Sequence, residues 1–344
     1  MDVFARHLTD VGRAAGLAAV GVASVDRFDR AQREIERRKG EGLHAGMGFT
    51  FKSPSRSSDP LASFPTARAL IAGAYAYGIA PGPSEHEVGP FGDIARYAQS
   101  DHYAQLELAL GVVATELRSH GFTAIVVADQ NHLVDREVAY QAGLGWYGRS
   151  SNLLIPGQGS WHVLGCVVTD APLPPNRVPV ADGCGTCTKC IQACPTGAIV
   201  ANGVVDARRC LAWIVQAPGD IPLEFREAMG TRVYGCDDCQ EVCPPNRRQD
   251  RVRTSRHRAG DSVAVPLIEL LELTDAAILD RHGRWYISER DPKYLRRNAL
   301  VALGNAGDHS ARVLATLDRY AHGSDPLLAE HAHWASNRLG QAAS

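Results

Sequence analysis

Apolar residues recur with two different periods along the first half of the chain. Short, nearly continuous apolar runs, typical of buried strands, cover residues 18–25, 67–77, 122–127 and 161–169. Residues 102–120 repeat apolar positions at helical spacing, and residues 133–144 are also predicted to be helical. A charged helix is predicted within residues 26–39, and the Gly-, Ser- and Pro-rich residues 40–66 are predicted to be loop. This alternation predicts an α/β or α+β domain up to about residue 170.

The second half of the chain begins at a proline-rich boundary. APLPPNRVP, residues 171–179, indicates a break between domains. A cysteine-rich segment follows at residues 182–246, and the pattern after residue 258 is helical to the end. The last three helical segments, joined by GNAGD and GSD turns, resemble a HEAT-type helical repeat. We therefore predict three domains, residues 1–175, 176–248 and 249–344.

Composition excludes several classes of protein. The chain has 344 residues, of which 45% are hydrophobic and 22% charged, as in ordinary globular proteins. A net charge of −2 predicts no partner by itself, so a nucleic-acid contact would require a local basic patch. The charged start and the short apolar stretches predict neither a signal peptide nor a membrane span. Closely spaced cysteines in a chain this long favour metal ligation in a reducing cytoplasm.

The cysteine spacing indicates iron–sulfur chemistry. Cys184, Cys187, Cys190 and Cys194 form C-x2-C-x2-C-x3-C-P, the bacterial-ferredoxin signature for a [4Fe–4S] cluster. In two-cluster proteins the fourth cysteine of this run ligates the other cluster. Zinc is the alternative metal for CxxC pairs, but this run packs too many thiolates on one tight turn for a single tetrahedral zinc and suits a cubane with a neighbour.

The second run, CDDCQEVCP, lacks one ligand, and Cys210 in DARRCLAW is the candidate to complete it. Two ferredoxin-like clusters are then predicted. The first takes Cys184, Cys187, Cys190 and Cys243, and the second takes Cys194, Cys210, Cys236 and Cys239. Cys166 lies in an apolar strand and is predicted to be a packed small hydrophobe.

Several motifs together resemble the epoxyqueuosine reductase family. The cysteine runs CGTCTKCIQACPTGAI and YGCDDCQEVCPPN match it, as do AYQAGLGWYGRSSNLL, MGFTFKSPSRSSDP, IARYAQSDHY and LRRNALVALGN, in the family's order. The resemblance implies an oxidoreductase that converts epoxyqueuosine to queuosine at the tRNA wobble position. It implies a base-off cobalamin in the N-terminal domain, similar to that of reductive dehalogenases, with the adjacent clusters reducing its cobalt.

The resemblance also implies a catalytic acid. The aspartate that opens the family's D-x-x-P-x-x-E-R is Asp129 here, just past a predicted strand end. An alkoxide is a poor leaving group, so a positioned carboxylic acid would donate a proton to it. That role would require a pKa raised by burial. The alternative is that Asp129 only caps the following helix.

Position in the family motifs implies a set of cobalamin contacts: Arg56, Tyr97, Asp129, Leu153, Gly165, Trp213 and Asp238. Each has a plainer alternative, such as a surface cation, a core aromatic or a strand glycine that makes room for packing. The chain also departs from the family motifs at His132, Asp135-Arg136, Arg149-Ser150-Ser151, Cys166 and Trp213. These departures put the details of substrate contact in doubt.

An arginine run follows the cysteines. The residues concerned are Arg247, Arg248, Arg251, Arg253, Arg256 and Arg258, and Arg296 and Arg297 extend the set. A solvated loop is the plain interpretation, and contact with the phosphates of tRNA is the functional one. An external low-potential electron donor, no membrane and a monomeric state are also expected. The alternatives to the reductase are an iron–sulfur electron carrier and a cobalamin-dependent enzyme similar to reductive dehalogenases.

Overall fold

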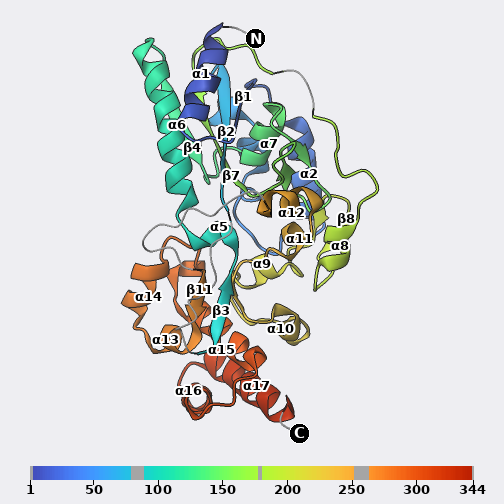
Figure 1. The fold of residues 1–344 in the computed structure, drawn as a ribbon, viewed down its shortest axis with the longest axis vertical. Helices are drawn as coiled ribbons and strands as arrows, with labels where there is room; N and C mark the ends of the chain where they lie inside the picture. Colours follow the sequence, from blue (N-terminus) through green and yellow to red (C-terminus); the bar gives the residue numbers. More distant parts are fainter. Residues whose placement is uncertain (1–2, 79–88, 177–179, 252–262, 343–344) are drawn as a thin grey trace.

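The computed structural model describes residues 3–78, 89–176, 180–251 and 263–342 of the chain. Figure 1 shows an elongated molecule with a sheet and its helices at one end and three helices of the C-terminal segment at the other. The cysteine-bearing elements lie beside and below the sheet. Of the helices in the described ranges, none is both long enough and apolar enough to cross a membrane.

A four-stranded sheet forms the core of the first 170 residues. Its spatial order is β1-β2-β7-β4, with bounds Ala19–Ala23, Ala69–Ala76, His162–Thr169 and Ala124–Ala128. Every neighbouring pair is antiparallel. The mixed α/β character is thus confirmed, and the sheet has the α+β rather than the parallel arrangement. Alternation of strands and helices along a sequence does not fix the direction in which successive strands run.

Helices cover both faces of this sheet. One layer is formed by α1 and α6, and the other by α2 and α7, with bounds Val3–Ala14, His102–Ser119, Asp29–Gly40 and Asp135–Gln141. Ile71 of β2 packs in the first layer, whereas Leu70 and Ala72 pack in the second. Because successive side chains of a strand point to opposite faces, a strand that is covered on both faces has a continuous run of apolar residues in its sequence.

A second sheet combines strands from all three predicted domains. Its order is β10-β3-β11, with bounds Arg232–Tyr234, Phe91–Ile94 and Ala264–Pro266. β3 pairs in parallel with β10 and antiparallel with β11. The short helix α5, Arg96–Gln99, follows β3 and carries Tyr97 towards the cysteine-bearing segment. The predicted domain boundaries remain a prediction, and this sheet connects the segments on either side of them.

Short elements carry the cysteines and the loops around them. They are α8 Lys189–Ala193, α9 Leu211–Ile214, α10 Leu223–Met229, α11 Asp238–Glu241 and α12 Pro244–Asp250, with the hairpins β5–β6 (Trp146–Tyr147, Leu153–Leu154) and β8–β9 (Ile199–Ala201, Val204–Val205). Two further short helices, α3 Pro54–Ser57 and α4 Pro60–Ser63, lie in the segment predicted to be loop.

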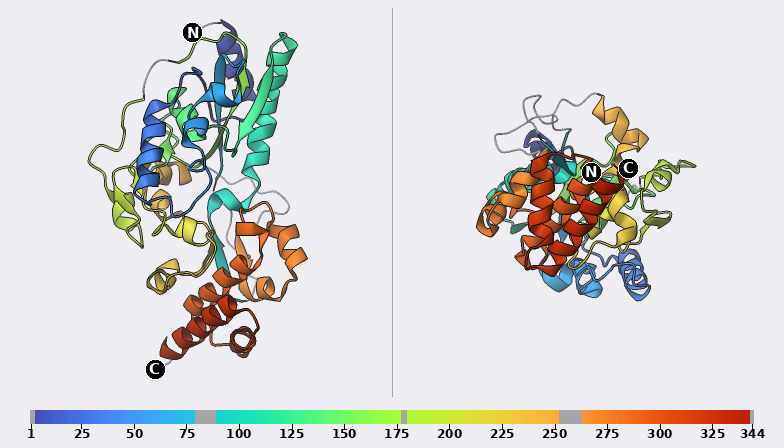
Figure 2. Two further views of the ribbon diagram at one scale, coloured as in Figure 1. Left: turned by 180° about the vertical axis from the view of Figure 1, so that it is seen from behind. Right: turned by 90° about the horizontal axis from the view of Figure 1, so that it is seen from below.

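The C-terminal segment is helical, as the pattern predicts. Its elements are α13 Leu267–Glu272, α14 Asp275–His282, η1 Ser288–Arg290, α15 Lys293–Ala306, α16 Ala311–Ala321 and α17 Pro326–Ala342. The last three lie side by side when seen from below (Figure 2). A Cβ on Gly304 would lie 2.7 Å from the Ala335 Cα, so glycine permits the close approach of α15 and α17. The HEAT-type repeat remains a prediction.

Candidate active site and cysteine groups

The first group of cysteines is Cys184, Cys187, Cys190 and Cys243. Burial, together with smaller contributions from Cys184, Cys190 and Cys187, raises the pKa of the Cys243 thiol to about 11. The pKa of Cys190 is likewise raised by burial and by Cys184 and Cys187. The last cysteine of the second run therefore lies with the first three of the first run.

The second group of cysteines is Cys194, Cys210, Cys236 and Cys239. Burial raises the pKa of Cys236 to about 12, with a contribution from Cys210. The pKa of Cys239 is raised by burial and then by Cys236 and Cys210, and that of Cys210 by burial and by Cys194. Cys210, which precedes α9, thus lies with three cysteines of the two runs.

The spacing of the sulfurs fits a cluster better than a single zinc ion. In the described part of the chain, no three of these sulfurs all lie within 4.8 Å of one another. A tetrahedral zinc with Zn–S bonds of about 2.3 Å would bring its sulfurs to about 3.8 Å. A [4Fe–4S] cubane binds one thiolate at each of its four iron corners, so its cysteine sulfurs lie farther apart than those around a zinc ion.

Donors from the surrounding chain point at the sulfurs. The Trp146 indole Nε1–H donates to Cys184 Sγ at 3.5 Å, and the Ala198 N–H donates to Cys194 Sγ at 3.1 Å. Arg149 donates to the Gly185 carbonyl and, at 3.0 Å, to Asn202 Oδ1. Hydrogen bonds to cluster thiolates stabilise negative charge and tune the reduction potential, so the contacts from Trp146 and Ala198 suit thiolate ligands, whereas Arg149 holds the backbone beside Cys184.

Asp129 follows directly after β4, in the left-handed region of backbone space. Its φ is +51°, a conformation that aspartate adopts more readily than most residues. Its N–H donates to Asp135 Oδ2 at 3.2 Å. The residue that precedes α7 is Val134, so Asp129 does not cap that helix. The alternative that Asp129 serves only as a helix cap is therefore excluded. The carboxyl is open to solvent, yet the protein around it removes enough water to raise its pKa.

Three other titratable side chains surround Asp129, and we call the four together the acid site: Asp129, Asp135, Tyr103 of α6 and Tyr234 of β10. The pKa of Asp135 is raised by burial and then by Asp129. The pKa of Tyr103 is raised by burial, then by Asp129 and Asp135. Burial raises the pKa of Tyr234 to about 12, with a smaller contribution from Asp129. All four groups are thus kept protonated to higher pH than usual.

The loop after Asp129 is anchored to the segment that carries Arg56. The Thr50 N–H donates to Asn131 Oδ1 at 2.7 Å, and the Ser57 hydroxyl donates to the Asn131 carbonyl at 3.0 Å. Arg56 lies on α3, is exposed, and donates to Ser63 Oγ at 3.3 Å. The motif that contains Arg56 and the motif that contains Asp129 are therefore neighbours.

Tyr97 and Trp213 lie between the acid site and the second group of cysteines. Tyr97 is half-buried, its ring is 6.2 Å from that of Tyr234, and its hydroxyl accepts from Gln216 at 3.1 Å. A Cβ on Gly235, the residue before Cys236, would lie 3.1 Å from the Tyr97 ring. Trp213 donates from Nε1 to the Ala45 carbonyl at 3.2 Å, and its ring stacks at 6.4 Å on Tyr286.

The other predicted cobalamin contacts have structural partners. Asp238 forms an ion pair with Arg232 at 2.5 Å, and Leu153 is buried in the core beneath α7. A Cβ on Gly165 would lie 2.9 Å from both the Ala128 Cβ and the Val127 carbonyl, so packing alone requires glycine there. Cys166 is fully buried in the same core cluster as Leu153.

Comparisons with known proteins agree with this geometry. Residues 183–246 match the model of the 4Fe-4S double cluster binding domain. The chain is 42% identical to an epoxyqueuosine reductase of Vibrio cholerae over 249 residues, which are 70% of this chain and 66% of that protein. It is 31% identical to an epoxyqueuosine reductase of Bacillus cereus over 339 residues, which are 94% of this chain and 86% of that protein. The chain belongs to the epoxyqueuosine reductase family.

Solved structures of the epoxyqueuosine reductase family have the same fold. One, a crystal structure with an epoxyqueuosine-modified tRNA-Tyr stem loop, has a TM-score of 0.87 at 29% identity, covering 98% of this chain and 90% of that one. Another, from Bacillus subtilis, has a TM-score of 0.86 at 29% identity, covering 97% and 90%, and has an aspartate-bearing catalytic loop swung out of the active site. The predictions of an oxidoreductase and of an iron–sulfur domain are confirmed.

The arginines of the predicted RNA-binding set differ in their surroundings. Arg247 and Arg248 on α12 and the adjacent Arg251 are exposed. The one acid of the run, Asp250, accepts from Arg96 Nη1 at 2.8 Å, so its charge is compensated from another element. Arg253, Arg256 and Arg258 lie outside the described residues.

Two arginines of that set hold the fold together. Arg297 is fully buried and donates to the carbonyls of Ala217 at 2.9 Å, Ile214 at 3.2 Å and Gly219, so the prediction that it contacts RNA is wrong. Burial lowers its pKa to about 10. Arg296 is mostly buried, pairs with Asp275 at 2.5 Å and donates to a carbonyl at 2.7 Å. Both side chains serve as bridges between chain segments.

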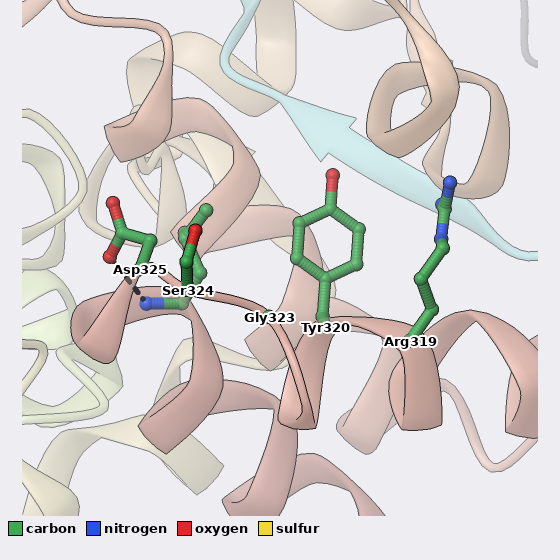
Figure 3. Close-up of a pocket in the computed structure, with 6 residues that line it drawn as sticks. Arg319, Tyr320, Gly323, Ser324 and Asp325 are labelled. Carbon is green, nitrogen blue, oxygen red and sulfur yellow. Dashed lines mark hydrogen bonds between the residues drawn. The ribbon is translucent and has the colours of Figure 1, made fainter.

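Two further features lie away from the acid site. A cavity of about 290 Å³ at the turn between α16 and α17 is lined by Arg319, Tyr320, Gly323, Ser324, Asp325 and Leu328 (Figure 3). The side chains of Asp220, Glu330 and His331 converge on a second spot. There, His331 Nε2 accepts from the Ile221 N–H and Glu330 binds Arg226 through both oxygens, so these donor atoms are already engaged.

The sequence reasoning missed Asp135, Tyr103 and Tyr234 as members of the acid site. Asp135 appeared only as a departure from the family's E-R, and the two tyrosines stand on elements far from Asp129 along the chain. Trp146 lies in the motif GLGW, and nothing in its spacing predicts that the indole reaches Cys184.

Proposed function

We propose that this chain reduces epoxyqueuosine to queuosine at the tRNA wobble position, with electrons supplied through two [4Fe–4S] clusters and cobalamin and a proton supplied by Asp129. The reaction consumes two electrons and two protons, converts the epoxide to an alkene and releases water. Membership of the family supports the reaction, and the relatives of known structure include one with an epoxyqueuosine-modified tRNA stem loop.

The position of Asp129 is the observation that carries the proposal. Its carboxyl is accessible, its pKa is raised by burial, and it stands at a strand end in a constrained backbone conformation. A general acid has to be protonated near the working pH and within reach of the leaving oxygen. The Bacillus subtilis relative has an aspartate-bearing catalytic loop, which supports the same role here.

The cysteines are proposed to hold one cluster in each group, as the spacing of the two runs predicts. Cys184 and Cys187 of the first group lie on a loop whose residues Gly183, Gly185 and Thr186 are exposed. The second group lies beside Tyr97 and Trp213, which border the acid site. Electrons from an external low-potential donor would therefore enter at the first group and leave from the second.

The residues around the acid site fit a large, flat, largely apolar cofactor. Tyr286 is 56% exposed although it stacks on Trp213 and its N–H bonds to Tyr234 at 2.8 Å. Such exposed aromatic surface beside charged groups is typical of a ligand-binding surface. Trp213, Tyr97, Arg56 and Asp238 would hold the corrin, with Leu153 behind them. When bound, cobalamin supplies a strongly reducing cobalt centre.

The tRNA is proposed to contact Arg247, Arg248 and Arg251. Their exposed guanidinium groups are suited to backbone phosphates, which supply most of the sequence-independent affinity of such complexes. Because modifying enzymes splay the target base out of its stack, the acid site needs only the single modified nucleotide. Arg253, Arg256 and Arg258 stay in the proposed set on the basis of sequence.

The test is mass spectrometry of tRNA nucleosides from cells that lack the gene and carry this chain or its variants. The wild-type chain should restore queuosine, and Asp129→Asn should leave epoxyqueuosine with a turnover lowered about 10²- to 10⁴-fold, the contribution of a general acid. Asp325→Asn is the matched control, because the Asp325 carboxylate accepts from the Leu328 N–H at 3.1 Å at the start of α17, away from the acid site. Wild-type turnover by Asp129→Asn with clusters and corrin intact would reject the acid role, and purified protein that takes up no corrin would indicate an electron carrier.

A further inference from the structure

Asp135 has a carboxyl oxygen that the fold leaves without a partner. Its Oδ2 accepts the Asp129 N–H at 3.2 Å, whereas its Oδ1 is buried and has no hydrogen-bond partner within the described structure. An ionised carboxylate with an unpaired buried oxygen is costly, and binding a proton removes most of that cost. The geometry therefore favours a neutral carboxylic acid immediately beside Asp129.

The proposed reaction consumes two protons at one oxygen atom. Removal of an epoxide oxygen as water delivers two protons to the same atom, and a single carboxyl can supply only one before it must be reloaded. The acid site holds two carboxyl groups: that of Asp129 is accessible, and that of Asp135 is half-buried with a buried Oδ1. Their number matches the number of protons consumed.

We propose that Asp135 is the second acid of the site, a positioning residue that fixes the backbone of Asp129 and returns a proton to it after the first transfer. The proposal rests on the proposed function. In the first step a C–O bond breaks, the Asp129 O–H breaks, and the proton joins the departing oxygen. The Asp129 carboxylate then turns towards Asp135, the Asp135 O–H breaks, and its proton passes to Asp129. Asp129 donates again as the second C–O bond breaks and water leaves. Solvent reaches the accessible Asp129 carboxyl and restores the protons of both acids, so two protons are consumed per turnover. The two electrons come from the external donor through the clusters and cobalamin.

Charged and titratable groups from every adjoining element act on Asp135. Asp129, after β4, raises the pKa of Asp135, and Arg136 on α7 lowers it. Tyr103 on α6 and Cys166 on β7 face it as well, and Asp135 raises the pKa of both. Burial is the largest contribution, and the net direction of the Asp135 pKa is well above its ordinary value. As the pH rises through that raised pKa, the Asp135 carboxyl loses the proton that it would pass to Asp129. Turnover should therefore fall at alkaline pH.

The experiment compares kcat against pH for the cofactor-loaded wild type, Asp135→Asn and Asp135→Ala. The amide oxygen of Asp135→Asn still accepts the Asp129 N–H, so this variant keeps the loop but carries no proton. We expect kcat to fall at least tenfold, with KM unchanged and the alkaline decline moved to lower pH. Asp135→Ala should show the same changes together with a higher KM, because it also releases the loop. Asp325→Asn, again a change at a backbone-capping aspartate, should keep the wild-type profile.

Infrared spectroscopy gives a second measurement that does not depend on activity. A protonated buried carboxyl has a C=O stretching band distinct from that of a carboxylate. The wild type at neutral pH should show such a band for Asp135, and this band should be absent from Asp135→Asn. An unchanged pH profile in Asp135→Asn, or the absence of the band from the wild type, would overturn the role of Asp135 while leaving the proposed function intact. A wild type inactive on epoxyqueuosine tRNA at every pH would reject the proposed function, and this role with it.

Discussion

The two groups of cysteines differ in their surroundings although they arise from similar runs of sequence. Around the first group, Gly183, Gly185, Thr186 and Lys189 are exposed, and α8 lies at the outer edge of the molecule (Figure 1). Around the second group, Tyr234, Gly235 and Asp237 are buried, and Tyr97 packs against the chain beside Cys236. One group therefore faces solvent and the other faces the acid site.

This difference gives the pair of proposed clusters a direction. A donor protein can approach only what is near the surface, and a buried reaction needs its last carrier close by. Cys190 of the first group is near enough to raise the pKa of Cys239 in the second, so the two groups are neighbours. The ligand exchange between the runs, with Cys243 in the first group and Cys194 in the second, makes this separation of roles possible on one small segment.

Loss of Cys210 should have the largest effect, because it removes a ligand of the cluster next to the acid site. In Cys210→Ser, iron should fall from about eight to about four atoms per chain, and reductase activity should fall below detection. Iron analysis with electron paramagnetic resonance checks this. Cys166→Ala is the control: Cys166 is fully buried in the core, so iron should be retained and stability should fall by about 1 kcal/mol. Full iron in Cys210→Ser would remove Cys210 from the ligand set.

The crossing of ligands between the runs is tested by double variants. Cys239→Ser added to Cys210→Ser should remove no further iron, because both cysteines belong to the second group. Cys243→Ser added to Cys210→Ser should remove all of it, since Cys243 belongs to the first group. Equal iron in the two double variants would show that the runs do not exchange ligands. Iron content per folded chain, with circular dichroism as the folding control, is the measurement.

Local sequence predicts much of the arrangement of the cysteine groups and the acid site, but it does not predict all of it. Cysteine spacing predicts both groups because neighbours on a tight turn stay neighbours in the fold, and Asp129 follows from a motif at a strand end. Nothing local places Tyr103 and Tyr234 beside it, because the sheet and the β3–β10 pairing bring those elements together. The direction of strands in the sheet was likewise not determined by the order of elements.

The arginines show the same limit. Arg297 has the same sequence signature as a surface cation, and only the packing of α15 against the loop after α9 buries it among carbonyls. A charged residue in a helical pattern predicts exposure on average, but a guanidinium that satisfies several orphan carbonyls can be buried. The sequence therefore identifies the basic residues but does not separate the exposed ones from those buried in the fold.

Removal of iron should be faster from the first group than from the second. An iron chelator reaches the exposed loop around Cys184 before the site bordered by Tyr97, so release should be biphasic, with the fast and slow phases of similar size. Absorbance of the iron–sulfur band follows it. Cys210→Ser should keep the fast phase and lack the slow one. If that variant instead keeps only the slow phase, the assignment of the outer and inner clusters is reversed.

The smallest expected effect comes from loss of the Trp146 indole, and it tests whether the reduction potential of one proposed cluster can change without that of the other. Its Nε1–H donates to Cys184 Sγ at 3.5 Å and thereby stabilises the more negative, reduced state of the proposed first cluster. In Trp146→Phe the reduction equilibrium of that cluster should become about three- to tenfold less favourable, a shift of about 30–60 mV to more negative potential at 59 mV per decade. Redox titration followed by electron paramagnetic resonance should find the second cluster unchanged. Trp285→Phe is matched to it, because the Trp285 indole donates to the Ala98 carbonyl at 2.9 Å and not to a cysteine, and it should shift neither potential. If both clusters move together in Trp146→Phe, the indole acts through the fold of the whole segment, and the electronic separation of the groups fails.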